Sequence, residues 1–187
     1  MALPSPSSFF ILLGISELGL ALFKRSGKNT DSKDHGSLGM LWAVIGASIF
    51  LAIYGSYAWP QFNFGFSGAA YAFGALLFIL GIALRWWSII HLDRFFTVNV
   101  AIAKDHRVVS DGPYHYVRHP SYTGALMAFF GLGLLVHNWL SALVLIVPIT
   151  CMFLWRIKIE ERALSTALGE AYTDYMAHTK RLAPFLY

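Results

Sequence analysis

The stretch DGPYHYVRHPSYTG, residues 111–124, crowds polar, aromatic and turn-forming residues between two long apolar segments. Gly112-Pro113 is a turn dipeptide, and Pro120 disfavours helical backbone at His119 while suiting the first position of a helix. We therefore expect a helix to begin near Pro120. The first N–H groups of a helix have no partner within it, so this start suits a ligand carboxylate or phosphate. The alternative is an ordinary basic loop at a membrane interface.

The composition around this stretch is that of a membrane protein. Of 187 residues, 57% are hydrophobic and 13% are charged, whereas soluble domains are about a quarter charged. The length suits one domain, residues 1–187, with about five membrane crossings of roughly 20 residues each. The net charge is +4, but Lys and Arg stand at the ends of apolar segments, the pattern that orients membrane helices. We predict an all-α, multi-span membrane helical bundle without a nucleic-acid partner.

Five apolar segments are predicted to span the membrane, at residues 8–23, 38–59, 68–91, 122–136 and 139–155. The last two are short and close in sequence, so they should form an antiparallel hairpin. Apart from Arg85, every Lys and Arg falls in the first loop, in the third loop or after the fifth segment. The positive-inside rule therefore predicts an N-terminus outside and a C-terminal helix in the cytoplasm.

Two ionisable residues and several glycines lie within the predicted spans. Arg85 stands near the cytoplasmic end of its span, so we expect its long side chain to snorkel toward the interface. An ionised Glu17 should face the bundle interior or a polar cavity, with a functional role. The alternatives are a structural contact with another helix and simple proximity to the cytoplasmic boundary. The glycines predicted to be close helix-packing positions are Gly14, Gly19, Gly46, Gly74 and Gly81.

Arg156 and Glu160 are four residues apart where the fifth segment becomes charged, so on a helix they share one face and can address one pocket. Arg presents a planar fork that matches a carboxylate, and Glu160 can accept from hydroxyls or from an ammonium group. The alternative is a solvated helix face, on which such an ion pair contributes only a few tenths of a kcal/mol.

The sequence gives little support for a metal site or for a nucleotide-binding motif. The histidines, among them His115 and His119, lack the spacing of a metal site on a predicted helix, and the single cysteine, Cys151, lies in an apolar run. The sequence holds no Gly-rich phosphate loop and no dinucleotide fingerprint. We predict no metal site and exclude a soluble Rossmann-type fold.

Four short motifs taken together resemble the isoprenylcysteine carboxyl methyltransferase family, whose core is shared with membrane phospholipid N-methyltransferases. They are GPYxxVRHPSYxG at 112–124, RxxxEE at 156–161, LGExYxxY at 168–175 and RLxPF at 181–185. The resemblance covers about residues 85–187. It implies an S-adenosylmethionine pocket at the cytoplasmic membrane surface, closed by the last helices and their loops, with the lipid acceptor entering from the bilayer.

The resemblance also implies roles for individual residues. Arg156 falls at the position that binds the acceptor carboxylate. The implied cofactor contacts are Asn99, His106, Arg107, Val108, Val109, Tyr114, His119, Pro120, Ser121, Tyr122 and Glu160. The chain departs from the eukaryotic members, which usually carry a longer acidic run beside Glu160 and additional N-terminal spans. A prenylated-protein substrate therefore does not follow from the resemblance alone.

The resulting hypothesis is methyl transfer from S-adenosylmethionine to a membrane-embedded or hydrophobic acceptor, with the carboxylate of an isoprenylcysteine-like lipid favoured. One alternative is a phospholipid amine N-methyltransferase. Another is a non-catalytic sensor or transport component, in which Glu17 and Arg85 form a polar pathway. The resemblance implies the plasma (inner) membrane in a prokaryote and the endoplasmic reticulum in a eukaryote.

Overall fold

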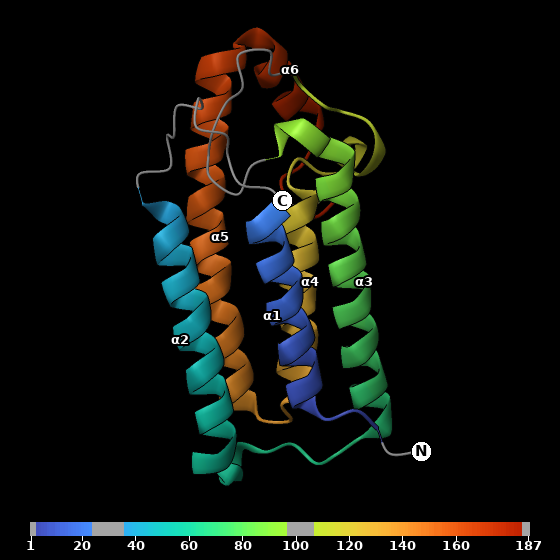
Figure 1. The fold of residues 1–187 in the computed structure, drawn as a ribbon, viewed down its shortest axis with the longest axis vertical. Helices are drawn as coiled ribbons and strands as arrows, with labels where there is room; N and C mark the ends of the chain where they lie inside the picture. Colours follow the sequence, from blue (N-terminus) through green and yellow to red (C-terminus); the bar gives the residue numbers. More distant parts are fainter. Residues whose placement is uncertain (1–2, 24–35, 97–106, 185–187) are drawn as a thin grey trace.

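In the part of the chain that the structure describes, five long helices run alongside one another as a single bundle, and a short sixth helix lies across one end (Figure 1). The computed structural model describes residues 3–23, 36–96 and 107–184. The helices are α1 (Pro6–Phe23), α2 (Ser37–Ala58), α3 (Gly68–Leu92), α4 (Pro120–Leu135), α5 (Trp139–Leu168) and α6 (Glu170–His178). Short 3-10 turns, η1 (Pro60–Phe62), η2 (Asp93–Phe95) and η3 (Gly112–His115), lie in the connections. The predicted all-α bundle is confirmed.

The helix ends follow local signals in the sequence. Pro120 is the first residue of α4, and His119 before it is outside the helical region at φ −123° and ψ 58°. The helix start predicted at Pro120 is therefore confirmed. Asn138 caps α5, because its Oδ1 accepts from the N–H of Ser141 at 2.9 Å. Gly169 then ends α5 with φ at +58°, a backbone conformation that favours glycine.

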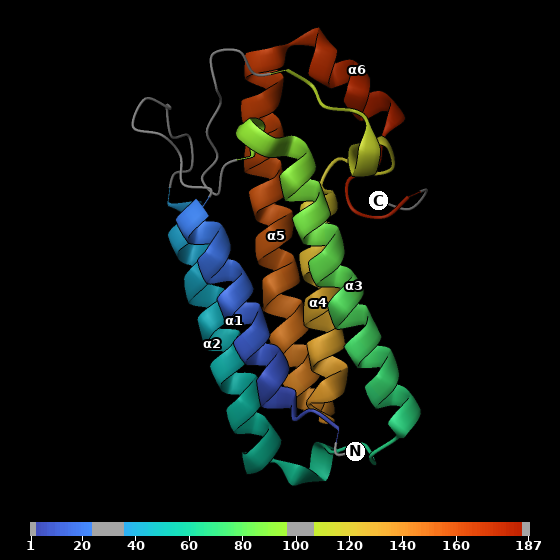
Figure 2. The same cartoon turned by 45° about the vertical axis from the view of Figure 1, so that its right-hand side comes forward.

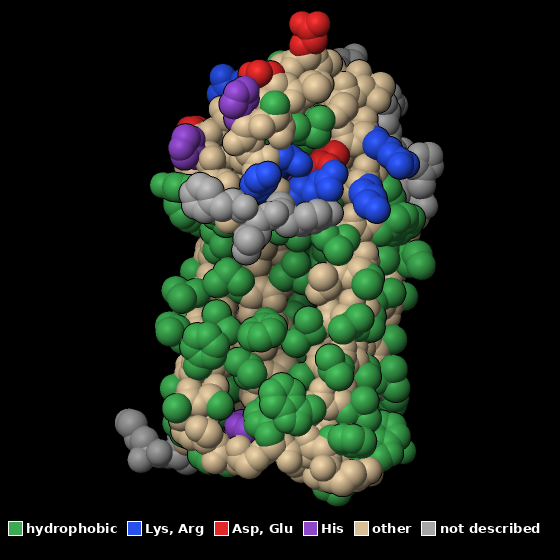
Figure 3. Space-filling view, turned by 180° about the vertical axis from the view of Figure 1, so that it is seen from behind, with side chains coloured by type: hydrophobic (Ala, Val, Ile, Leu, Met, Phe, Trp, Pro, Cys, Tyr) green, Lys and Arg blue, Asp and Glu red, His purple; other side chains and the backbone are tan. Residues whose placement is uncertain are grey.

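The outer surface suits a lipid environment. Three described helical segments are long and apolar enough to cross a membrane, at Ser37–Ala58, Gly68–Phe95 and Trp139–Leu168, whereas α1 and α4 are apolar but shorter. Hydrophobic side chains cover most of the length of the bundle, and charged side chains gather at one end (Figure 3). Helix α5 continues past residue 155 and carries its charged residues, which lie within 156–162, into that end. Below, we call it the charged end.

Glycines bring α3 and α4 into close contact. A Cβ added at Gly81 would lie 2.5 Å from the carbonyl oxygen of Gly124, and one added at Gly131 would lie 2.5 Å from that of Gly74. No side chain fits in either place, so the backbones approach each other directly, as small residues allow in membrane helices. The packing roles predicted for Gly74 and Gly81 are confirmed.

The same prediction is wrong for Gly14 and Gly46, because a Cβ on either would meet no heavy atom within 4 Å. At Gly19 a Cβ would only reach the ring of Trp86 at 3.9 Å. Helix α1 instead packs through larger side chains, such as Phe9, whose ring meets that of Phe78 edge-on at 5.3 Å. Helical periodicity alone does not tell which glycine faces a neighbouring backbone.

Candidate active site

One cavity of about 470 Å³ begins at the charged end and extends into the bundle. Its polar end is lined by side chains from α3, α4 and α5, among them Arg85, Tyr122, Arg156 and Glu160. Its apolar end lies between α1, α2, α4 and α5 and is lined by Leu13, Leu41, Ile45, Ile49, Phe129 and Phe153. The volume falls within the range of about 300–1,000 Å³ found for small-molecule sites. A ligand that fills this cavity meets charge at one end and hydrocarbon at the other.

The segment that leads into α4 is held in place by the C-terminal segment, which returns to it from α6 (Figure 2). The N–H of Arg118 donates to the carbonyl of Lys180 at 2.8 Å, and the N–H of His119 donates to that of Arg181 at 3.0 Å. The hydroxyl of Thr123 donates to the carbonyl of Leu182 at 2.7 Å. The polar end of the cavity therefore depends on residues about 60 positions away in sequence.

Glu161 joins these segments through a largely buried cluster of charged and polar side chains. Its Oε1 accepts from Nε of Arg118 at 2.9 Å and lies 3.3 Å from Nε2 of His119. Its Oε2 accepts from Nε of Arg181 at 2.9 Å. We call Glu161, Arg118, His119 and Arg181 the Glu161 cluster. Sequence reasoning assigned no site role to Glu161, Arg118 or Arg181. The signal that could have found them is the adjacency of Glu160 and Glu161, because neighbouring residues on a helix point in different directions and need different partners.

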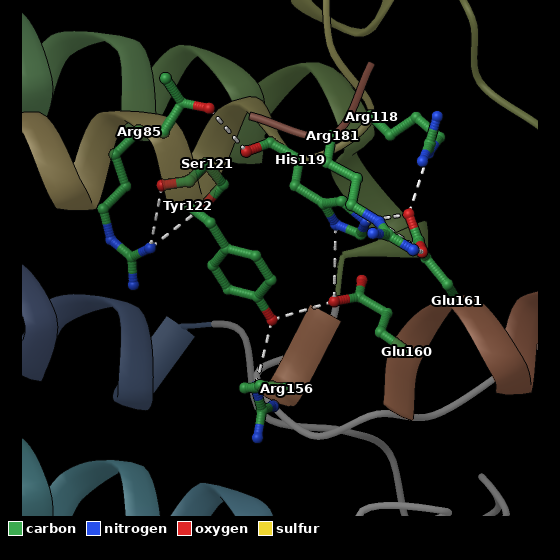
Figure 4. Close-up of polar contacts among 10 residues, drawn as sticks. Arg85, Arg118, His119, Ser121, Tyr122, Arg156, Glu160, Glu161 and Arg181 are labelled. Carbon is green, nitrogen blue, oxygen red and sulfur yellow. Dashed lines mark hydrogen bonds and ion pairs between the residues drawn. The ribbon is translucent and has the colours of Figure 1, made fainter. Parts of the chain in front are cut away.

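On the neighbouring face of α5, Arg156 and Glu160 meet at the hydroxyl of Tyr122 (Figure 4). This hydroxyl donates to Oε2 of Glu160 at 2.9 Å and accepts from Nε of Arg156 at 3.1 Å. A second amino group of Arg156 donates to the hydroxyl of Ser37, at the start of α2, at 2.8 Å. Arg156 is 2% exposed, and it lines the same cavity as Glu160. The two residues do address one pocket, and Ser37 is a contact that the sequence did not indicate.

Glu17 and Arg85 form a two-pronged ion pair between α1 and α3. Nε and one amino group of Arg85 donate to the two carboxylate oxygens at 2.7 and 2.8 Å, and another amino group donates to Oγ of Ser121 at 3.1 Å. Both ionic side chains are largely buried and line the cavity. The snorkelling predicted for Arg85 is therefore wrong, because a buried carboxylate on α1 holds the guanidinium inside the bundle. For Glu17, the structure has the predicted contact with another helix.

Most residues implied as cofactor contacts line the cavity, namely Arg107, Val108, Val109, Tyr114, His119, Ser121, Tyr122 and Glu160. Pro120 is fully buried at the first turn of α4, where its cofactor contact stays a prediction. Asn99 and His106 lie outside the described residues.

The cavity also has tyrosines in its wall that sequence reasoning did not assign to the site, Tyr172 and Tyr175. Burial raises the pKa of Tyr175 to about 12, so its hydroxyl stays protonated and donates to the carbonyl of Tyr114 at 2.6 Å. Burial also raises the pKa of Tyr114, whose hydroxyl donates to the carbonyl of Ser88 at 3.3 Å. These neutral hydroxyls tie α6 and α3 to the segment before α4.

Comparison with known proteins finds similarity in the half of the chain that carries most of these cavity residues. Residues 74–166 match the model of the isoprenylcysteine carboxyl methyltransferase family. The protein-S-isoprenylcysteine O-methyltransferase B of Arabidopsis thaliana is 34% identical over 116 residues, which cover 61% of this chain and 59% of the relative. The protein-S-isoprenylcysteine O-methyltransferase of Schizosaccharomyces pombe is 33% identical over 142 residues, which cover 74% of this chain and 60% of the relative.

A solved structure has the same fold. It is the eukaryotic intramembrane Ras methyltransferase named isoprenylcysteine carboxyl methyltransferase, which aligns with a TM-score of 0.65 and 26% identity over 77% of this chain and 52% of its own. The chain thus spans about three fifths of the length of the curated relatives and about half of this structure. The matched residues include α4 and most of α5, which carry Tyr122, Arg156 and Glu160. The chain belongs to the isoprenylcysteine carboxyl methyltransferase family.

Proposed function

We propose that this protein transfers the methyl group of S-adenosylmethionine to the carboxylate of a membrane-embedded, isoprenylcysteine-like acceptor. The observation that carries the proposal is the position of Arg156 and Glu160, one helical turn apart in a cavity that is polar at one end and apolar at the other. Family membership supports the reaction type.

The polar end of the cavity fits the cofactor chemically. Glu160 offers a carboxylate, 30% exposed at its side chain, that suits the ammonium of the cofactor's methionine part. The start of α4 at Pro120 is suited to a carboxylate, because helix N-termini favour negative charge. His119, Ser121 and Tyr122 would complete the contacts, with Asn99 and His106 from the segment outside the described residues. When bound, the cofactor supplies a methyl group already activated by its sulfonium.

The other half of the site suits a lipid that ends in a carboxylate. The guanidinium of Arg156 is oriented by Tyr122 and Ser37, so its planar fork is held ready for a carboxylate. The apolar end of the cavity would take the prenyl chain. An ionised carboxylate is a nucleophile without losing a proton, so the protein needs no general base and mainly has to orient the reactants and exclude water.

The orientation in the membrane is part of the proposal. With the charged end in the cytoplasm, the cofactor site is open to soluble cofactor and the N-terminus lies outside, in keeping with the positive-inside rule. Single cysteines introduced at Ser67 and Lys180, after replacement of Cys151, test this in sealed vesicles. Labelling of both from the same side would contradict the five-span topology.

The reaction is tested with purified protein in liposomes, S-adenosylmethionine labelled in its methyl group, and N-acetyl-S-farnesylcysteine as acceptor. We expect a base-labile methyl ester. The matched control is the corresponding cysteinamide, which lacks the carboxylate and should give no product. A base-stable methylamine formed from phospholipid in the same liposomes would instead support amine methylation, and no binding of labelled cofactor would contradict a methyltransferase.

A further inference from the structure

The hydroxyl of Tyr122 is the one described side-chain group for which hydrogen bonds to both Arg156 and Glu160 are observed (Figure 4). Its position is set by contacts of the ring with two neighbouring rings. The ring stacks on that of His119, with centroids 5.6 Å apart and planes 17° from parallel, and it meets the ring of Phe153 at 5.1 Å. The hydroxyl is therefore held between the cation and the carboxylate rather than free to rotate toward solvent.

The direction of the two hydrogen bonds gives this hydroxyl a polarity. A hydroxyl has one proton to donate, and here it is donated to Glu160, so an oxygen lone pair accepts from Arg156. The three groups thus alternate as cation, dipole and anion. Hydrogen bonds in such a chain polarise one another, and more strongly where water is scarce. A change of charge beside Glu160 is therefore transmitted to the guanidinium.

We propose that the Tyr122 hydroxyl couples the two ligands of the site, so that a cation bound at Glu160 increases the affinity of Arg156 for a carboxylate. This inference rests on the proposed function, in which the cation is the cofactor's ammonium and the carboxylate belongs to the acceptor. An ammonium beside Glu160 competes with the Tyr122 hydroxyl for the carboxylate and weakens the hydrogen bond between Tyr122 and Glu160. The hydroxyl oxygen then becomes a weaker acceptor for Arg156. The guanidinium charge is therefore less neutralised and attracts the acceptor carboxylate more strongly.

The consequence is a preferred order of binding. Coupling between sites is reciprocal, so a bound carboxylate must also tighten the cofactor. The acceptor would be held firmly only when a methyl donor is in place, which keeps the lipid from occupying the site unproductively. Besides its proposed cofactor contact, Tyr122 acts on the acceptor through Arg156, as a positioning residue.

A direct charge interaction between Arg156 and Glu160 could also couple the ligands, because the two side chains leave the same helix face one turn apart. The hydroxyl is the part that a conservative change can remove. Tyr122→Phe keeps the ring and its stacking on His119 but deletes both hydrogen bonds. The control is Tyr71→Phe, because the Tyr71 hydroxyl donates to the carbonyl of Pro4 at the opposite end of the bundle.

The experiment measures equilibrium binding of N-acetyl-S-farnesylcysteine to purified protein with and without saturating S-adenosylhomocysteine, which has the same ammonium and carboxylate but no methyl group to transfer. In the wild type and in Tyr71→Phe we expect S-adenosylhomocysteine to tighten the acceptor about tenfold, within the usual range of coupling between sites. In Tyr122→Phe we expect the ratio of the two dissociation constants to fall below about twofold. Because Tyr122 also belongs to the proposed cofactor contacts, S-adenosylhomocysteine is raised to a saturating concentration for this variant.

The ratio separates this role from a structural one, because a distorted site weakens each ligand without removing the dependence of one on the other. A tenfold ratio that persists in Tyr122→Phe overturns the inference and leaves direct charge interaction as the cause. A wild-type ratio near one overturns it as well. If the wild type binds neither S-adenosylhomocysteine nor the acceptor, the proposed function itself fails and this inference falls with it.

Discussion

Glu160 and Glu161 are neighbours in sequence but belong to two different regions of the molecule. The side chain of Glu161 is 7% exposed and accepts from Arg118 and Arg181 beside His119. The side chain of Glu160 is 30% exposed, lines the cavity and accepts from the neutral hydroxyl of Tyr122. A step of one residue along α5 thus separates a carboxylate paired with two arginines from a carboxylate that faces a ligand site.

The difference shows that burial and hydrogen-bonding partners give two adjacent carboxylates different roles. Enclosing an ionised group is costly unless ionic partners and hydrogen bonds satisfy it, and Glu161 has both. Among the described residues, Glu160 accepts from the Tyr122 hydroxyl and lies 3.9 Å from Nδ1 of His119, and it keeps contact with the cavity. We therefore expect changes at Glu161 to act on stability, and changes at Glu160 and Arg156 to act on ligands.

The largest effect should come from removing the enclosed carboxylate. Glu161→Ala leaves buried Arg118 without its carboxylate partner, and loss of one member of a buried ion pair costs about 3–5 kcal/mol. We expect the midpoint of thermal unfolding in detergent to fall by about 10 °C. Glu170→Ala, at an exposed position on α6, is the control and should change it by no more than about 2 °C. Equal midpoints for the two variants would mean that the Glu161 cluster does not hold the site together.

The next effect concerns the acceptor. Arg156→Ala should lower kcat/KM for the acceptor at least a hundredfold, about 3 kcal/mol, since it removes an oriented charge-assisted contact. Cofactor affinity should stay within a few-fold of the wild type. Arg156→Lys should recover only part of the activity, because an ammonium lacks the planar fork. Equal losses of cofactor and acceptor would show that Arg156 is not the carboxylate anchor.

A smaller effect should follow from neutralising the exposed carboxylate. Glu160→Gln keeps the size and some hydrogen bonding of the side chain but removes its charge. We expect S-adenosylmethionine to bind at least tenfold more weakly, about 1.4 kcal/mol, with an unfolding midpoint close to that of the wild type. Calorimetric titration and thermal unfolding of the same sample measure both. A large drop in the midpoint with unchanged affinity would reverse the roles assigned to Glu160 and Glu161.

The smallest effect should come from a neutral contact of the same C-terminal segment. Thr123→Val deletes the hydrogen bond to the carbonyl of Leu182 but keeps the shape of the side chain. The loss should be about 1 kcal/mol, which corresponds to about 2–4 °C in the unfolding midpoint. A loss as large as that of Glu161→Ala would show that the backbone contacts of the segment, and not the ion cluster, hold it to α4.

Much of the architecture was predictable because its signals are local. Apolar length and turn residues predicted the five long helices and the start of α4 at Pro120. The spacing of Arg156 and Glu160 predicted their shared pocket, because helical periodicity by itself puts residues four apart on one face. Family resemblance added the cavity positions from Tyr114 to Tyr122.

By itself, the sequence determined the helices, the single charged end and the pairing of Arg156 with Glu160, since each depends on residues within a few turns of one another. Only the tertiary structure decided that Arg85 turns inward to Glu17, 68 residues away, and that Glu161 binds Arg118, 43 residues away. Those choices depend on which helix faces are brought together, and an ionised group inside the bundle is stable only beside the partner that the fold supplies.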